Sequence, residues 1–351
     1  MTVLTEESFG SRERVTMDDV ARRAGVSRAL VSIVMRAAPG ASEEKRLRVL
    51  EAAAELGYRP DVRAQSLAGQ RSRVIGVMFG VTVGAFHFEL LDGLFTAAES
   101  HGHNLILSPL TRSRDEGTAA RSLQGFRFDA LIMLSPPTSH PLLAGRIPLA
   151  VVGWRVDHPL VDTVRTDDDR GIQAAVDHLV ALGHRDIAHI DGGDTMIADA
   201  RRSAYLTAME RHGLTELAWV VPGGQSQVDG LDGARRLCSG PRAPTALVAY
   251  NDDIAVAAIG VFAQHGIAVP EGISVVGYDD SRMADLSPVP LTTVVQRPDE
   301  LGRLAVERMV ARVEQRRIVE REIVLEPELR IRSSTAPPSA AVERSTTYST
   351  H

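Results

Sequence analysis

Two short apolar stripes separated by a glycine lie in residues 16–36, TMDDVARRAGVSRALVSIVMR, and they constrain the fold more than any other feature of the chain. Thr16 and Asp19 have the spacing of a capping box, in which the hydroxyl accepts one free helix amide and the acid accepts another. The helix that follows is apolar at i, i+3, i+4 and i+7, namely at Met17, Val20, Ala21 and Ala24. Gly25 stands where this helix must end with a positive φ, and Ser27 can cap a second helix. The spacing predicts a helix-turn-helix, although a helical hairpin inside a core would have the same pattern.

The predicted second helix has one apolar face and one outward face. Its inner face is formed by Leu30, Val31 and Val34. Its outward face, near the amino-terminal half where a recognition helix meets base edges, carries Arg28, Ala29 and Ser32. In a helix-turn-helix, these three side chains are the best placed to contact DNA bases.

A third helix is predicted after Ser42, because Glu43 and Glu44 favour the positive end of a helix. We expect its buried side to consist of Leu47, Leu50, Ala53 and Ala54. The helix ends at the segment LGYRP, and residues 61–68 offer a further short helical segment.

From Arg73 onward, apolar strands alternate with amphipathic helices. We expect strands at residues 74–79, 104–108, 130–134, 148–153, 187–190, 219–221, 246–250, 273–276 and 323–325. We expect helices at residues 89–101, 116–124, 171–182, 200–212, 228–238, 252–264 and 300–313. Helices between apolar strands indicate parallel sheets that are covered on both faces. Ligands of such sheets bind beyond the carboxyl ends of the strands.

Polar side chains gather at those predicted strand ends, in residues 191–194, 251–253 and 279–280. Short side chains with paired acceptors, together with an arginine, suit the hydroxyl groups of a sugar, because buried donors and acceptors must be matched. Each acid taken singly could instead be a helix cap, and Asp168 and Asp252 could be nothing more.

The chain resembles the LacI/GalR family of bacterial transcription regulators. The resemblance runs from VTMDDVARRAGVS through VLEAAAELGYRPDVRAQSLAGQRSRVIGV and continues in DHLVALGHRDIAHIDGG, ALVAYNDDIAVAAIG, ISVVGYDD and PLTTVVQ. It implies an all-α helix-turn-helix DNA-binding domain at residues 16–60, a hinge helix and linker at 61–72, and an effector-binding and dimerisation domain at 73–332. The ends, residues 1–15 and 333–351, lie outside the resemblance, and we expect both to be disordered.

The resemblance implies that the second domain is an α/β, two-lobed effector domain like the type I periplasmic binding proteins. The chain would cross between the lobes near Thr166, Thr293 and Val319. We therefore expect one lobe at about 73–166 and 294–319, and the other at about 167–293 and 320–332.

The resemblance also implies effector contacts. Arg201 matches the ligand-clamping arginine, Asn251 and Asp279 match two further sugar-contacting positions, and Phe86, His87 and Phe88 stand where the first lobe contacts the ligand. Ala204 replaces a common glycine, and Gly153-Trp154 stands where many members have an acid. Both departures leave the identity of the effector open.

The predicted DNA contacts are Thr16, Ser27, Arg28, Ala29, Ser32, Ile33, Arg36, Tyr58, Arg63 and Leu67. Leu67 matches the leucine with which the hinge helix of the family wedges open the minor groove, although it could also be a linker residue that packs on its own domain. Ile33 and Arg36 depart from common family choices, so we expect the operator sequence to differ from the usual one.

The charge distribution agrees with a DNA-binding first domain. Residues 11–73 carry a formal charge of +5, whereas residues 74–351 carry −9, within a net charge of −6. This distribution suits a first domain that contacts DNA phosphates and a second domain that does not.

Enzymatic and metal-binding motifs are not found in the sequence, so we expect neither an enzyme nor a cofactor nor a metal site. The rival classes are a solute- or sugar-binding protein and a carbohydrate-active enzyme. The amino terminus lacks the apolar segment of a secretory signal, and Cys238 is the only cysteine, which together indicate the bacterial cytoplasm and its nucleoid. We expect a homodimer, or a tetramer, that binds palindromic double-stranded operator DNA and represses transcription under the control of a small effector, most simply a sugar.

Overall fold

The computed structural model describes residues 15–35, 39–58, 72–80, 84–111, 113–134, 147–318 and 320–339. The chain divides into two units, residues 1–72 and residues 73–351. The expected disorder of residues 1–14 and the hinge helix at 61–68 lie outside the described residues.

The first unit contains three helices: α1 (Met17–Ala24), α2 (Arg28–Met35) and α3 (Glu43–Leu56). The predicted capping box of α1 is present, because the backbone amide of Asp19 donates to the hydroxyl of Thr16 and Asp19 Oδ2 accepts from the Thr16 amide at 2.9 Å. Gly25 ends α1 at φ 63°, a conformation that costs glycine little. The start and the end of α1 are therefore determined by residues that are close in sequence, as predicted.

The core of the first unit differs from the prediction along α3. Leu47 and Leu50 are 54% and 47% exposed, and Ala54 is exposed as well, so their predicted burial is wrong. The inner side of α3 is formed by Val49, Ala52, Ala53 and Leu56. The helix thus carries two apolar stripes of similar spacing, and packing against α1 and α2 buries the one with the smaller side chains.

The first lobe of the second unit contains one parallel sheet. Its strands are β1 (Val74–Gly80), β2 (Asn104–Leu110), β3 (Ala130–Leu134), β4 (Leu149–Val152), β5 (Val161–Thr166) and β11 (Glu322–Leu325). Their order is β11-β5-β4-β3-β1-β2, and Ile75 pairs with Leu105 on one side and Ala130 on the other. Apolar strands buried on both faces are typical of such a sheet.

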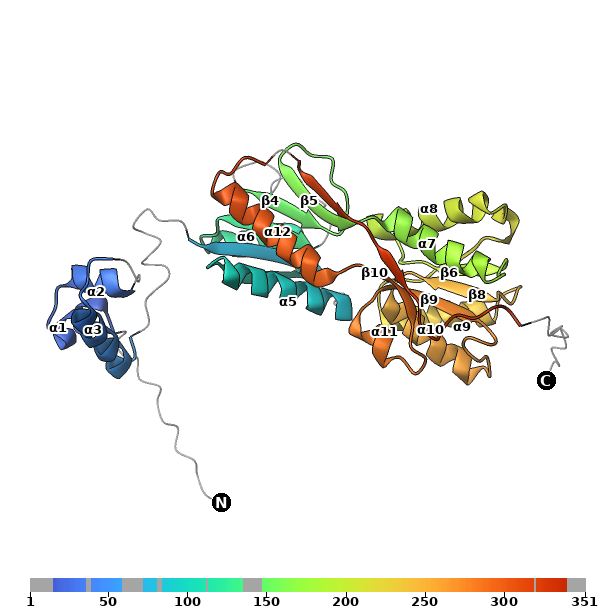
Figure 1. The fold of residues 1–351 in the computed structure, drawn as a ribbon, viewed down its shortest axis with the longest axis horizontal. Helices are drawn as coiled ribbons and strands as arrows, with labels where there is room; N and C mark the ends of the chain where they lie inside the picture. The colour runs from blue at the N-terminus through green and yellow to red at the C-terminus, as the bar shows by residue number, and fades with distance from the viewer. Residues whose placement is uncertain are drawn as a thin grey trace, which may run out of the picture. The chain divides into compact units, whose positions relative to one another are not determined.

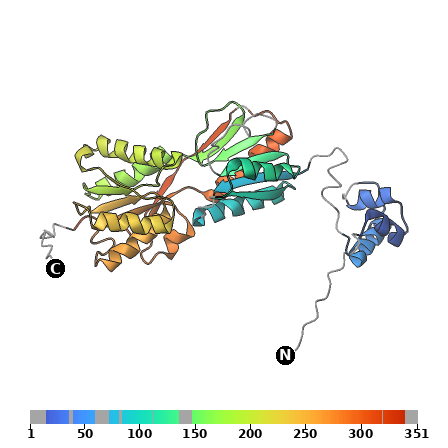
Figure 2. The same ribbon diagram turned by 180° about the vertical axis from the view of Figure 1, so that it is seen from behind.

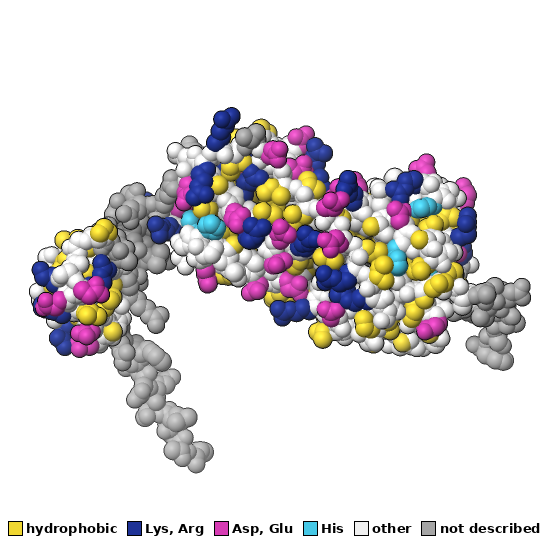
Figure 3. All heavy atoms as spheres, in the orientation of Figure 1, with side chains coloured by type: hydrophobic (Ala, Val, Ile, Leu, Met, Phe, Trp, Pro, Cys, Tyr) yellow, Lys and Arg dark blue, Asp and Glu magenta, His cyan; other side chains and the backbone are white. Residues whose placement is uncertain are grey.

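Helices cover both faces of this sheet: α5 (Ala85–Ser100) and α12 (Pro298–Val313) on one face and α6 (Glu116–Gln124) on the other (Figures 1 and 2). Two glycines bring α5 and α12 close together. A Cβ on Gly93 would lie 2.7 Å from the backbone of Asp299, and one on Gly302 would lie 2.8 Å from that of Leu90. Acidic and basic side chains are interspersed over the exposed side of α12 (Figure 3), where Arg303 pairs with Glu307 at 2.9 Å.

The second lobe repeats this architecture. Its strands are β6 (Ile187–Ile190), β7 (Trp219–Val221), β8 (Ala246–Ala249), β9 (Ser274–Asp279), β10 (Thr292–Val295) and β12 (Glu328–Arg330). Their order is β12-β10-β9-β8-β6-β7, with β12 antiparallel to β10 and the other pairs parallel. Its helices are α7 (Asp168–Ala181), α8 (Met196–Arg211), α9 (Gln227–Cys238), α10 (Asp252–Gln264) and the short α11 (Arg282–Leu286), with one 3₁₀ turn at Thr215–Leu217.

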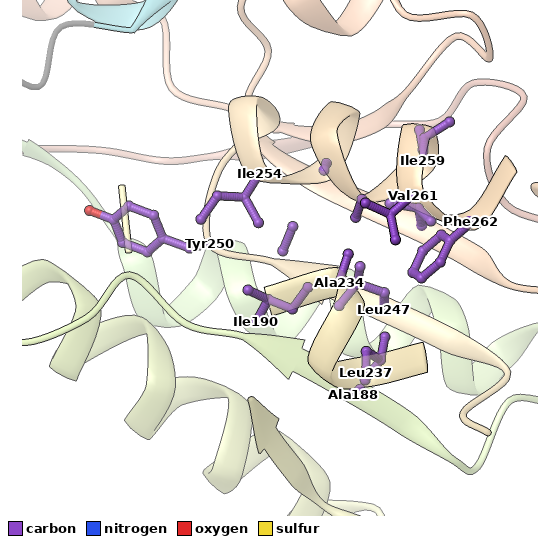
Figure 4. Packing of buried hydrophobic residues seen from close by; sticks show 14 of the residues in the cluster. Ala188, Ile190, Ala234, Leu237, Leu247, Tyr250, Ile254, Ile259, Val261 and Phe262 are labelled. Carbon is purple, nitrogen blue, oxygen red and sulfur yellow. The ribbon is translucent and has the colours of Figure 1, made fainter. Parts of the chain in front are cut away.

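Two apolar clusters sandwich the second sheet. Helices α9 and α10 pack on one face, where Phe262 of α10 belongs to the same cluster as Ile190 and Leu247 of the strands (Figure 4). Helices α7 and α8 pack on the other face through Ile172 and Tyr205. In Figure 4, Tyr250 lies at one end of the first cluster, apart from the aliphatic side chains. That end is where the functional site is found.

The sheet topology places the three crossings between the lobes. They fall at residue 167, at residues 296–297 and at residues 326–327. The expected crossing near Thr293 is therefore displaced, since β10 stays in the second sheet as far as Val295. The expected boundary at Val319 is wrong, because residues 322–325 pair with β5 in the first lobe.

Residues 333–339, which we expected to be disordered, pack on the second lobe. Ser334 is fully buried; its hydroxyl donates to the Val275 carbonyl at 2.6 Å and accepts from the Thr292 amide at 2.8 Å. Composition misled the prediction here because small hydroxyl side chains, which are common in disordered tails, can also hydrogen bond along strands. Residues 340–351 lie outside the described part of the chain.

A search of the described helices for a segment long and apolar enough to cross a membrane finds none.

Candidate functional site

A cavity of about 170 Å³ lies between the two lobes. The first lobe contributes a mostly apolar wall that includes Phe86, Leu90, Leu134, Val152 and Trp154. The second lobe contributes a mostly polar wall that includes Thr195, Arg201, Gln225, Asn251, Asp253 and Asp279. The site is at the carboxyl ends of the strands, as expected for parallel sheets.

Arg201 is the central charge of the polar wall. It projects from α8 and is only 4% exposed. Its Nε donates to Asp168 Oδ1 at 2.9 Å, and its Nη1 donates to the Tyr250 carbonyl at 2.7 Å. Its guanidinium carbon lies 3.6 Å from the centre of the Tyr278 ring. Burial lowers the pKa of Arg201, but Asp168, Tyr278, Tyr250 and Asp279 together raise it above its usual value, so this side chain stays protonated.

Asp279 faces Arg201 from the end of β9. Its Oδ1 accepts from Gln296 Nε2 at 2.6 Å and lies 4.0 Å from Arg201 Nη1. Burial raises the pKa of Asp279 well above its usual value, and the nearby Arg201 only partly offsets this rise. Asp279 and Asp280 both have positive φ values, 122° and 54°, which are costly for residues other than glycine. The backbone is thus strained at the point where β9 enters the site.

Asn251 serves two roles at once. Its Oδ1 accepts from the Ile254 amide at 2.9 Å and so caps α10, while its Nδ2 donates to the Gln225 carbonyl at 3.3 Å at the cavity wall. The neighbouring Asp252 is fully buried and does not line the cavity. It accepts from the amide of Ser281 at 2.8 Å and from the hydroxyl of Thr293 at 2.6 Å, which ties α10 to β9 and β10.

The predicted contacts of the first lobe divide into two groups. Phe86 and His87 line the cavity, but Phe88 is 65% exposed and lies outside its wall. The reason is that α5 begins at Ala85, and successive residues of a helix point about 100° apart. Burial lowers the pKa of His87, so its imidazole is neutral at pH 7.

The sequence prediction missed several cavity residues, among them Trp154, Gln225, Tyr250, Asp253 and Gln296. Asp253 follows Asn251 within YNDD, and Gln296 ends PLTTVVQ, so both were in segments already noted. Trp154 follows β4 and was noted in the sequence only as a departure from the family, without being assigned a contact with the effector.

On the first unit, Arg28 and Ala29 of α2 are exposed, while Ser32 and Ile33 are half-buried. Arg28 lies 3.4 Å from Asp18 of α1, an exposed pair of little energetic value. Thr16 and Ser27 use their hydroxyl groups as helix caps, and Tyr58 packs on the helical core. Arg36, Arg63 and Leu67 lie outside the described residues. Of the outward face predicted for α2, Arg28 and Ala29 are therefore exposed and Ser32 only partly so.

Comparisons with known proteins agree with both halves of the molecule. Residues 16–61 match the model of bacterial regulatory proteins of the lacI family, and residues 176–335 match a periplasmic binding protein-like domain. The ribose operon repressor of Escherichia coli (strain K12) is 32% identical over 91% of this chain and 99% of its own length. The chain belongs to the LacI family of bacterial transcriptional regulators.

Solved structures of this family share the fold. The lac repressor dimer bound to operator and the anti-inducer ONPF aligns with a TM-score of 0.83 and 29% identity, over 92% of this chain and 100% of that one. The complex of the transcriptional regulator CelR with cellobiose aligns with a TM-score of 0.67 and 28% identity, over the same shares. This LacI-family chain is a regulator and not an enzyme, like its curated relatives. In the described part of the chain, no group of three or more His, Cys, Asp or Glu side chains is placed to hold a metal ion.

Proposed function

We propose that this LacI-family regulator is a repressor that binds a near-palindromic operator as a homodimer in the bacterial cytoplasm, and that a sugar in the interlobe cavity controls it. The observation that carries the proposal is a polar wall with a buried Arg201 and Asp279, on a chain that also has a helix-turn-helix. Two similar proteins support it: a lac repressor that was solved as a dimer on operator, and a regulator that was solved with cellobiose. A tetramer is the alternative assembly, and analytical ultracentrifugation distinguishes the two.

Helix α2 is proposed to enter the major groove, with Arg28, Ala29 and Ser32 facing base edges. Arg22 and Arg36 would contact phosphates, and Ile33 can offer only apolar contact, for example to a thymine methyl. Because many family members have other residues at positions 33 and 36, the operator would differ from the common family sequence.

Residues 61–72 are proposed to form the hinge helix and linker, with Leu67 as a minor-groove wedge. Such a wedge costs a few kcal/mol of base unstacking per step, which the kinked duplex offsets by contacting more protein surface. Leu67→Ala should therefore weaken operator binding by tenfold or more in a mobility-shift assay. Unchanged affinity would indicate that Leu67 only packs on its own domain.

The effector is proposed to be small and rich in hydroxyl groups. A cavity of about 170 Å³ lies below the range of roughly 300–1,000 Å³ that is usual for drug-sized ligands, which favours a compact ligand such as a single sugar ring. Arg201, Asn251 and Asp279 can exchange hydrogen bonds with sugar hydroxyls, while Phe86 and Trp154 can cover the apolar face of the ring.

The test is to select an operator from random duplexes with the purified chain and then repeat mobility shifts across a panel of sugars. We expect a palindromic site, and a 5- to 150-fold change in its affinity with at least one sugar, which corresponds to about 1–3 kcal/mol of coupling. A chain that binds a sugar but shifts no duplex would instead be a solute-binding protein.

A further inference from the structure

The carboxylate of Asp253 lies at the contact between the two lobes. It projects from the first turn of α10 in the second lobe, and a Cβ built on Gly84 of the first lobe would come within 2.1 Å of its Oδ2. Its Oδ1 accepts from Gln227 Nε2 at 3.2 Å. Gly84 is the N-cap residue of α5 and has no side chain to keep the carboxylate away. Asp253 is therefore close to both lobes and also lines the cavity.

No cation balances this carboxylate within the described part of the chain. Gln227 is neutral, and burial raises the pKa of Asp253, as expected for an acid that loses water and gains no positive neighbour. His87, which also lines the cavity, does not supply the charge, because burial lowers its pKa.

The remaining charges of the cavity do not compensate for it either. Arg201 is the only Arg or Lys among the described residues of the cavity wall. It is already paired with Asp168 at 2.9 Å and lies 4.0 Å from Asp279. No other cation of the described cavity wall faces Asp253, so this part of the cavity favours groups that donate hydrogen bonds and disfavours a negative charge.

We propose that the cavity admits an uncharged, hydroxyl-bearing effector and excludes anionic relatives of it, and that Asp253 imposes this exclusion. The inference rests on the proposed function. An ionised carboxylate can only accept hydrogen bonds. It therefore binds a ligand hydroxyl, which can donate one, and repels a ligand carboxylate or phosphate at the same position. The repulsion is stronger than in open water because Asp253 is half-buried. Asp253 is thus a specificity-determining residue, distinct from Arg201 and Asp279, which pair with each other.

The test is isothermal titration calorimetry of the full chain with matched pairs of ligands: galactose and galacturonate, glucose and glucuronate, ribose and ribose 5-phosphate. We expect the neutral member of the best-binding pair to bind at least tenfold more tightly than the anion, which corresponds to about 1.4 kcal/mol. Asp253→Asn, which keeps the shape but removes the charge, should reduce this ratio at least fivefold, chiefly by strengthening the binding of the anion. Asp253→Ser, a second neutral variant, should do the same.

The matched control is Asp232→Asn. Asp232 lies on the same lobe but is exposed on α9, where it pairs with Arg235 at 3.2 Å, so its substitution makes the same change in net charge away from the cavity. This variant should leave the ratio unchanged. The inference is overturned if an anionic ligand binds more tightly than its neutral partner, if no ligand of any pair binds, or if Asp253→Asn leaves the ratio intact.

These outcomes separate the inference from the proposed function. If operator binding responds to an anionic sugar, the proposed control of operator binding by an effector is supported, but the proposed exclusion of anions by Asp253 is wrong. If neutral sugars bind selectively but operator affinity never responds to them, the exclusion of anions is supported and the proposed control of operator binding is wrong.

Discussion

The two lobes of the effector domain repeat one strand order but differ in what they contribute to the cavity between them. The second lobe supplies the hydrogen-bonding groups Arg201, Asn251 and Asp279, whereas the first lobe supplies Phe86, Leu90 and Trp154. We infer that the second lobe binds the polar groups of the effector and that the first lobe excludes water when it closes. Two lobes of similar fold can thus have different roles, one in binding the effector and the other in closing over it.

The lobes also differ in how they are stabilised. The second lobe buries His189, Arg201 and Asp279 beside or near the cavity, so its stability and its binding depend on the same polar groups. In the first lobe, the carboxylate of Asp162 is buried and Arg312 contacts it at 2.7 and 2.8 Å, and neither residue is part of the cavity wall. Substitutions that affect charge should therefore act mainly through the second lobe.

Arg201→Ala should have the largest effect. It leaves Asp168 buried without its cation, and breaking a buried pair in this way costs about 3–5 kcal/mol of unfolding free energy. It should also abolish the response to effector while sparing operator binding in its absence. Urea unfolding measures the first effect and mobility shifts measure the second.

The control for this variant is Arg211→Ala, which removes a cation from the same helix where both it and its partner Asp177 are exposed. It should cost much less stability and leave the response in place. If effector still modulated operator binding in Arg201→Ala, the polar wall would have been assigned to the wrong residues.

Acidification should destabilise the second lobe before the first. His189 is fully buried, and burial lowers its pKa from 6.5 to about 4. The unfolded chain therefore takes up a proton at a higher pH than the folded chain, so stability is full above pH 6.5 and falls as the pH drops towards 4, by about 3 kcal/mol. Urea unfolding at pH 7 and pH 4.5 should show this loss.

His189→Gln should flatten that pH dependence, whatever its effect on stability at pH 7. The control is His101→Gln, at an exposed position in the first lobe, which should leave the pH dependence as it is. An equal slope in wild type and His189→Gln would refute the assignment.

Ile197→Ala should have the smallest effect. Ile197 belongs to the second lobe and packs, partly buried, both on that lobe's own cluster and on the Trp154 cluster of the first, so it contributes to closure as well as to folding. Truncating its side chain should cost about 1 kcal/mol of effector affinity and a similar amount of stability. Calorimetry with the best-binding sugar provides the measurement, and Leu206→Ala, 44% exposed on the same helix, is the matched control. Equal losses in both variants would argue against an interlobe role for Ile197.

Local sequence patterns predicted much of the fold. The capping box of α1, the left-handed Gly25 and the apolar strands of both sheets follow from neighbouring residues alone, and they were found where expected. Strands β5, β10 and β12 were missed because their short segments lack a continuous apolar run, and pairing with distant strands determines them. For the same reason, the sequence did not predict that residues 322–325 join the first lobe.

The cavity was predictable only in part. Asn251 and Asp279 stand at strand ends, Arg201 was assigned by the resemblance to the family, and all three line the cavity. Phe88 was misplaced because the start of α5 was expected four residues too late. Asp253 and Trp154 depend on how closely the lobes approach, which local sequence does not specify.

Hydrogen–deuterium exchange of the full chain, with and without the tightest-binding neutral sugar, tests most directly whether one lobe binds while the other closes. We expect slower exchange on both sides of the cavity, in residues 191–201 and 250–253 of the second lobe and residues 84–90 and 152–154 of the first. With Arg201→Ala, this protection should vanish from both lobes. Protection confined to one lobe, or found only at the far end of the second lobe around residues 262–273, would contradict the account.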